Sequence, residues 1–472
     1  MEALRPATAA PAEGLWSALK EAVRGSHRDF TAGSIPQSIF ILAVPMVLEF
    51  GMESVFAVVD VFVVSRLGPD AVATVGLTES LLTIVYAVAM GVSIGAMALI
   101  ARRVGEKDTE RAARTAVQAI ILGVLLALPV AAIGISLAPR LLGLMGGSPW
   151  VLLHGVRYMQ VMMGSTLSIT LLFLINAIFR GAGDAAVAMR VLWLANGLNC
   201  VLAPCLVLGL GPFPRLGVVG AAVATTIGRT SGVAYQLWRL SRPDGRITLL
   251  RRHLHIEWKT IARVLALSGP ATVQMLVGMV SWVAMVRIIS GFGSNAVAGY
   301  TVAIRIVTFA LLPSFGLANA AATLVGQNLG ARQPDRAERS VWLAAGFNSG
   351  FLLVVGLLLL AFAPGLIRLF SPDAAVVGFG VSCLRIVSVG FAFYGVGMVM
   401  TQSLNGAGDT RTPTLINFAC FWVLELPLAW GLAYGLGLGP RGAFLALLAA
   451  FCSVAVAGGL VFRTGRWKLR LV

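Results

Sequence analysis

The stretch PMVLEFGMESVFAVVDVFVVSRLG, from Pro45 to Gly68, decides the class of this fold. It is apolar and long enough to cross a bilayer, because about 20 helical residues span a hydrocarbon core of roughly 30 Å. It nevertheless carries three carboxylates, at Glu49, Glu53 and Asp60. An ionised carboxylate at the bilayer centre costs at least ~2.5 kcal/mol, so these side chains must face other helices or a wet cavity. The stretch therefore predicts a membrane helix that carries functional groups.

The rest of the chain shares this apolar character. Of its 472 residues, 58% are hydrophobic and only 12% are charged, and the mean hydropathy is +0.88. Soluble domains carry about 25% charged residues, so this composition predicts an all-α polytopic membrane protein. Twelve stretches are predicted to span the membrane, at residues 36–65, 70–100, 115–138, 152–179, 186–210, 217–238, 262–290, 295–326, 340–363, 375–404, 412–435 and 442–462.

The positively charged residues are unevenly distributed among the loops. Most of the 36 Lys and Arg residues lie in the two termini and in the loops that follow even-numbered spans. Because cytoplasmic loops are enriched in Lys and Arg, both termini are predicted to be cytoplasmic, in an inner membrane. The formal charge of +16 then needs no nucleic-acid partner. Near the N-terminus, GLWSALKEAVR fits either a short interfacial helix or a loosely ordered tail.

The sequence contains an internal repeat at one constant offset, the 225 residues between Pro45 and Pro270. The same offset relates Gly183 to Gly408, and it places RGAGD over NGAGD. Because each repeat holds an even number of spans, both lie in the membrane in the same orientation, as in many transporters. The predicted units are a tail at 1–34, a lobe of six spans at 35–240, a loop at 241–260, a second lobe at 261–465 and a tail at 466–472.

Several motifs follow one another in a recognisable order. The opening stretch continues as PDAVATVGL, the RGAGD and NGAGD loops follow spans four and ten, LGVVGAAVAT leads span six, and LVGQNLGA follows span eight. Over residues 35–465, this order resembles the prokaryotic multidrug and toxic compound extrusion (MATE) transporters. The resemblance implies two six-helix lobes with a V-shaped cleft that opens alternately to either side. It also implies export of organic, often cationic, drugs in exchange for protons or sodium ions.

The resemblance also implies a set of coupling residues. In one branch of the family, an Asp of span one, an Asn and an Asp of span five and a Thr of span six form a cation site. By motif, these positions correspond to Asp60, Asn199 and Thr225, but Ala203 stands where the second Asp is expected. In a sodium-coupled branch, a Glu of span seven occupies the position of Gly278 here. The sequence therefore favours protons over sodium as the coupling ion.

The three carboxylates of the opening stretch share one helix face. Relative to Glu49, Glu53 lies about 40° and Asp60 about 20° around the helix axis. Burial and mutual repulsion favour the protonated form, as reversible proton exchange requires. One interpretation is that Glu53 replaces the acid lost at Ala203 and Gly278. The alternative is that only Asp60 exchanges protons, and that the two glutamates are hydrogen-bonded within the helix bundle.

Further charged residues lie inside predicted spans, at Glu79, Glu425, Arg287 and Arg305. Because an unpaired charge is costly there, buried pairs are expected, for instance between Glu425 and Arg305. Contact with the substrate is the alternative role.

Four uncharged residues complete the candidates. Asn176 and Asn196 lie in predicted spans, where an amide can hydrogen-bond between helices or bind a cation. Met163 belongs to YMQVMM and Tyr394 to FAFYGVGMVM. Aromatic and methionine side chains suit an adaptable cavity for flat cations, but they are equally ordinary residues of a membrane core.

Other functions are less compatible with this sequence. The GAGD loops lack a Walker lysine, so no nucleotide is expected. RRHLH, at Arg251–His255, carries two histidines but is expected to be a positively charged loop and not a metal site. No cluster of polar catalytic groups indicates an enzyme, and no cofactor is expected besides the coupling ion. The rival function is that of a lipid-linked precursor flippase. The expected partners are organic cations and the bilayer, with the chain acting as a monomer.

Overall fold

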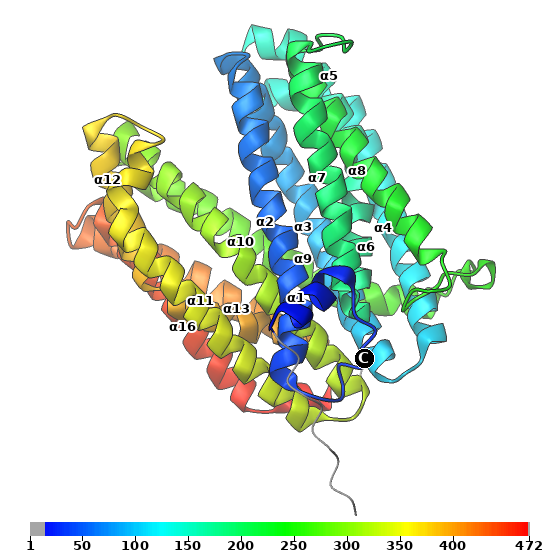
Figure 1. The fold of residues 1–472 in the computed structure, drawn as a ribbon. Coiled ribbons are helices and arrows are strands. Elements are labelled where there is room, and N and C mark those ends of the chain that lie inside the picture. Colours follow the sequence, from blue (N-terminus) through cyan, green and yellow to red (C-terminus); the bar gives the residue numbers. More distant parts are fainter. Residues whose placement is uncertain (1–14, 471–472) are drawn as a thin grey trace, which may run out of the picture.

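The computed structural model describes residues 15–470, and this part of the chain is built of helices with no strand. Figure 1 shows two groups of helices that approach each other at the lower end of the view and diverge toward the top. The first half of the chain forms α1 (Leu15–Arg24), α2 (Ile35–Ser65), α3 (Pro69–Gly105), α4 (Thr109–Leu144), η1 (Val151–Gly155), α5 (Val156–Gly164), α6 (Thr166–Ala182), α7 (Ala185–Leu208) and α8 (Val218–Leu240).

The second half repeats this order of helices. Its elements are η2 (Arg251–His253), α9 (Trp258–Ser290), α10 (Ser294–Gly330), α11 (Pro334–Arg368), α12 (Ala374–Val389), α13 (Phe391–Gly406), α14 (Arg411–Asn417), η3 (Phe418–Glu425), α15 (Leu426–Trp430), η4 (Gly431–Gly435), α16 (Pro440–Arg463) and η5 (Arg466–Leu469). Residues 1–14 of the predicted N-terminal tail and the last two residues lie outside the described part.

The helices are long and apolar enough to cross a membrane. Among the described residues, nine helical segments meet this test, and α12 with α13 makes a tenth if the bent pair is one span. The 31-residue α2 and the 23-residue α8, which carry charged side chains in their middle, complete the predicted twelve-helix layout. The chain is therefore a multi-pass membrane protein with two pseudo-symmetric six-helix lobes.

Two predicted spans are interrupted at equivalent positions of the repeat. The span expected at 152–179 breaks at Ser165, between α5 and α6, and the span expected at 375–404 bends by 57° at Gly390, between α12 and α13. Helices kink at small residues that allow close packing or local side-chain hydrogen bonds. Ser165 Oγ donates to the carbonyl of Met162 at 2.7 Å. A hydropathy pattern cannot reveal either break, because apolar residues lie on both sides of each.

The lobes meet at pairs of helix crossings that obey the repeat. Helix α3 packs against α9, and α10 packs against α2. A methyl group at Gly91 would lie 2.7 Å from the backbone nitrogen of Thr272, and one at Gly316 would lie 2.7 Å from that of Val47. Small residues let helix backbones approach this closely. The two crossings hold the lobes together over the C-terminal halves of α3 and α10, and the end of the molecule toward which these halves run is here called the closed end.

Both described terminal segments bridge the lobes at the closed end. Arg246, in the loop between the lobes, donates to the carbonyl of Ser26 at 2.9 Å, and Arg336 of α11 donates to that of Ala32 at 2.8 Å. At the other terminus, the backbone carbonyl of Arg470 accepts a hydrogen bond from an arginine side chain of α3 at 3.2 Å. The guanidinium of Arg470 forms an ion pair with a carboxylate beyond α13 at 3.4 Å. These segments therefore cross the seam between the lobes.

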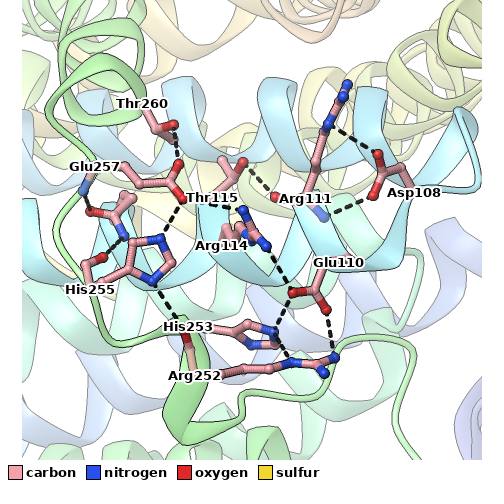
Figure 2. A network of polar contacts seen from close by, with 11 residues as sticks. Asp108, Glu110, Arg111, Arg114, Thr115, Arg252, His253, His255, Glu257 and Thr260 are labelled. Atoms are coloured by element: carbon pink, nitrogen blue, oxygen red, sulfur yellow. Dashed lines mark hydrogen bonds and ion pairs between the residues drawn. The ribbon is translucent and has the colours of Figure 1, made fainter.

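The loop between the lobes is fixed to the start of α4 (Figure 2). Glu110 accepts a hydrogen bond from Arg252 at 2.8 Å and lies 3.1 Å from the ring of His253, which is 2% exposed. Gln118 donates to the carbonyl of His255 at 2.8 Å. No group of three or more possible metal ligands exists within residues 15–470. The two histidines of RRHLH thus take part in a network that attaches the loop to the first lobe.

Candidate functional site

Helix α2 places its three carboxylates at successive depths in the first lobe. Pro45 lies inside the helix, where its missing N–H is tolerated because neighbouring helices pack around the freed backbone. The helix packs between α7 and α10. Glu49 lies nearest the closed end, Glu53 one turn further, and Asp60 faces the space between the lobes. Each carboxylate meets a different set of partners.

Glu49 forms a fully buried ion pair with Arg180. The guanidinium of Arg180 donates to Glu49 Oε1 at 2.7 Å, and the amide of Asn176 donates to the same oxygen at 3.1 Å. Gln236 of α8 donates to the carbonyl of Asn176's side chain at 2.7 Å, so α2, α6 and α8 are joined by one polar network. The sequence placed Arg180 in the RGAGD loop. It lies instead in the last turn of α6. The sequence did hold a signal for this ion pair, because a buried acid needs a cationic partner nearby.

Glu53 meets an amide and not a cation. Asn196 of α7 donates to Glu53 Oε2 at 2.8 Å. Asn196 is 4% exposed, while Glu53 is only half-buried. A carboxylate with a single neutral donor keeps free acceptor sites on its oxygens.

Asp60 lines a cavity of about 450 Å³ between the lobes. The cavity also contains Glu79 of α3, Thr225 and Arg229 of α8, and Arg305 of α10. A buried oxygen of Asp60 has no hydrogen-bond partner. Six aromatic side chains complete much of the wall, and they are Phe56, Phe62, Tyr86, Tyr158, Phe309 and Phe370. A pocket of this size and lining fits a drug-sized aromatic molecule.

The residues implied by the family motif come together around this cavity. Asn199 Nδ2 donates to Thr225 Oγ1 at 2.9 Å, and Thr225 lines the cavity with Asp60. The amide oxygen of Asn199 is buried without a partner, as is one oxygen of Asp60. Ala203, where the second acid is expected, is fully buried. Oxygen acceptors of this kind can hold a proton or coordinate a hard cation, but one carboxylate of the implied set is missing.

Arg229 is a cavity residue that the sequence alone did not single out. It is 6% exposed, and its Nη2 donates to the hydroxyl of Tyr86 at 2.9 Å. Its Nη1 is buried without a partner. The available signal was a basic residue in the middle of a predicted span, since such residues almost always face a bundle interior or a cavity.

The ion pair expected between Glu425 and Arg305 does not form. Glu425 lies in η3, is 1% exposed, and accepts from Ser281 of α9 at 3.4 Å. Arg305 lies on α10 and lines the cavity. The side chains of Glu425 and Arg305 point toward different neighbouring helices. Helical periodicity alone does not determine which neighbour a side chain faces. Arg287, at the end of α9, contacts Ser290.

Met163 and Tyr394 lie away from the cavity wall. Met163 is 4% exposed and packs so closely against α4 that a methyl group at Gly134 would lie 2.7 Å from it. Its neighbour Met162 lines the cavity instead. Tyr394 stacks on Phe451 inside the second lobe, with ring centroids 4.1 Å apart.

Comparison with known proteins supports the family resemblance that the sequence motifs indicated. The family model MatE matches twice, at residues 45–205 and 270–430, so its two matches reproduce the internal repeat. A probable multidrug resistance protein NorM of Thermotoga maritima is 26% identical over 93% of this chain and 94% of its own length. A FAD transporter of Shewanella oneidensis is 26% identical over 79% of this chain and 83% of its own length.

A solved structure of a multidrug resistance MATE family transporter in an outward-facing conformation has a similar fold. The TM-score is 0.87 at 26% identity, with 94% of this chain and 97% of the other covered. These relatives are transporters and not enzymes, and they support export of drugs or toxic compounds. With both halves matched by the family model and the whole fold shared, the chain belongs to the MatE family of multidrug and toxic compound extrusion transporters.

Proposed function

We propose that this chain exports organic molecules with a positively charged centre in exchange for protons, by alternating access of one cavity to the two sides of an inner membrane. It acts as a monomer, and its closed end, with the termini and the loop between the lobes, faces the cytoplasm. The structure then corresponds to an outward-open state. The observation that carries the proposal is Asp60, a half-buried carboxyl group with an unpartnered oxygen in the wall of the cavity between the lobes.

The proposed cycle follows from the charge of Asp60. In the outward-open state, a proton from outside neutralises Asp60 and removes the attraction for a positively charged ligand, which leaves. The lobes then rock about the crossings of α2 with α10 and α3 with α9, and Asp60 releases its proton to the cytoplasm. The ionised carboxylate attracts the next ligand. Protons are favoured over sodium because Ala203 removes one oxygen donor from the set around Asn199 and Thr225.

The test is efflux of a fluorescent cationic dye from proteoliposomes under an imposed pH gradient or an imposed sodium gradient. The wild type is compared with Asp60→Asn and with the control Asp70→Asn, which removes an exposed acid of the same lobe that contacts Ser148 outside the cavity. We expect the pH gradient to drive efflux by the wild type and the control, and Asp60→Asn to fall to the rate of protein-free liposomes. Gradient-driven efflux by Asp60→Asn, or efflux driven by sodium alone, would contradict the proposal.

A further inference from the structure

The cavity contains two arginines that no carboxylate neutralises by direct contact. Arg229 enters from the first lobe and Arg305 from the second. Within residues 15–470, neither forms an ion pair, although carboxylates elsewhere in the chain do so readily. The one hydrogen-bond partner of Arg229 is the neutral phenol of Tyr86, which leaves its buried Nη1 without an acceptor.

These two guanidinium groups therefore have hydrogen-bond donors available for a ligand. A guanidinium stays charged in proteins, and it carries donors in a fork that fits a carboxylate or a similar planar anion. A buried donor without a partner costs free energy that a bound acceptor recovers. Arg305 is exposed to the cavity, so a ligand can reach it without displacing a protein group.

The same cavity also holds two acids. Glu79 interacts electrostatically with Arg305 and Arg229, and Asp60 interacts with Glu79 and Arg229, but none of these charges forms an ion pair by direct contact. Two carboxylates and two guanidinium groups balance in charge, so a simple cation would meet repulsion from Arg229 and Arg305 as well as attraction from the acids. A ligand that carries both signs would satisfy both pairs at once.

We propose that the cavity selects zwitterionic aromatic molecules, with the anionic group bound by Arg229 and Arg305 and the positive centre bound by Asp60 and Glu79. This inference rests on the proposed function and narrows its substrate class. The six aromatic rings of the wall supply flat surfaces for the body of the ligand. Protonation of Asp60 still weakens the hold on the positive centre, so exchange for protons is retained.

The test uses two aminoxanthene dyes, one with a free carboxylate and the other its methyl ester. Binding to the purified, full-length protein in detergent is measured by fluorescence anisotropy, and efflux by proteoliposomes. We expect the wild type to bind the acid about tenfold more tightly than the ester, because a charge-assisted bond to arginine replaces a repulsion. Arg305→Gln should abolish this preference and leave ester binding unchanged or stronger.

Two further variants separate a specific effect from a structural one. Arg305→Lys keeps the charge and should retain part of the preference, since Lys binds anions as a point charge. Arg287→Gln removes an arginine that lies at the end of α9 and contacts Ser290, and it should leave the preference intact. Equal or tighter binding of the ester by the wild type, or an acid preference that survives Arg305→Gln, would overturn the inference.

The outcome also separates this inference from the proposed function. If both dyes are exported by the pH gradient with equal affinity, the zwitterion inference fails and the antiport proposal stands. If the acid dye binds in an Arg305-dependent manner but neither gradient drives its efflux, the zwitterion inference stands and the antiport proposal fails.

Discussion

At the scale of single residues, the acids of α2 differ in whether they have a charged partner. Glu49 is 1% exposed and paired with Arg180, whereas Asp60 has an unpartnered oxygen at a cavity. A buried ion pair contributes little net stability over apolar residues of similar size, but breaking it leaves an uncompensated charge. Both glutamates are hydrogen-bonded within the helix bundle, Glu49 to Arg180 and Glu53 to Asn196, and which of the two interpretations of the sequence holds for Glu53 stays a prediction.

The Glu49 pair predicts a characteristic pattern of stabilities. Glu49→Ala should lower the free energy of unfolding by about 3 to 5 kcal/mol, because Arg180 is left buried without a counterion. The double variant Glu49→Leu with Arg180→Met should recover most of that loss. Thermal unfolding in detergent measures both. The control is Glu106→Gln, which breaks the partly exposed ion pair between Glu106 and Arg103 and is expected to cost less than about 1 kcal/mol. A double variant as unstable as Glu49→Ala would contradict this account.

At the scale of helices, glycines at equivalent positions of the repeat set the approach of the lobes. The contacts of Gly91 with Thr272 and of Gly316 with Val47 are related by the offset that relates Pro45 to Pro270. A helix pair cannot keep this separation with a larger side chain at the crossing. The closed end thus depends on two small residues, each in the middle of a long helix.

Gly316→Ala should destabilise the closed end by about 1 to 3 kcal/mol, because the added methyl overpacks the crossing of α10 with α2. Gly91→Ala should have a similar effect at the other crossing. The control is Gly346→Ala on α11, where an added methyl meets no atom within 4 Å and where alanine favours the helix. Melting temperatures in detergent and dye efflux provide the measurements, and equal values for Gly316→Ala and Gly346→Ala would refute the role of the crossing.

At the scale of the whole molecule, the segment that precedes α2 connects the lobes through polar contacts at the closed end. Asp29 in this segment accepts a hydrogen bond from the backbone N–H of Thr31 at 2.9 Å, and its carboxylate lies 3.3 Å from the ammonium group of Lys107, just beyond the end of α3. The hydrogen bonds from Thr31 hold the pKa of Asp29 below its ordinary value of 3.8. Stability from this group is therefore present above that value and is lost as the pH falls through the lowered pKa.

Asp29→Asn should consequently have a pH-dependent effect. At pH 7 it should lower the melting temperature by about 1 °C, since a partly exposed pair contributes at most ~1 kcal/mol. As the pH falls through the lowered pKa, the melting temperatures of wild type and variant should converge, because both then carry a neutral side chain. Thermal unfolding in detergent over a pH series measures the difference, and a constant difference at every pH would contradict the assignment.

The sequence by itself determined the membrane helices, the repeat, the family and the shared face of Glu49, Glu53 and Asp60. These follow from hydropathy, from a constant offset and from helical periodicity, which are properties of short segments or of the sequence compared with itself. The bilayer also makes them reliable, since it requires every crossing segment to be long, apolar and helical.

Only the tertiary structure decided which charges meet. It paired Arg180 with Glu49, gave Glu425 the hydroxyl of Ser281, and placed Arg229 and Arg305 in one cavity without a direct ion-pair partner among the described residues. Helical periodicity gives the direction of a side chain around its own axis but not which distant helix it faces. That neighbour depends on how the helices of each lobe pack and on how closely the glycine crossings let the lobes approach, and both are set by contacts between residues far apart in the chain.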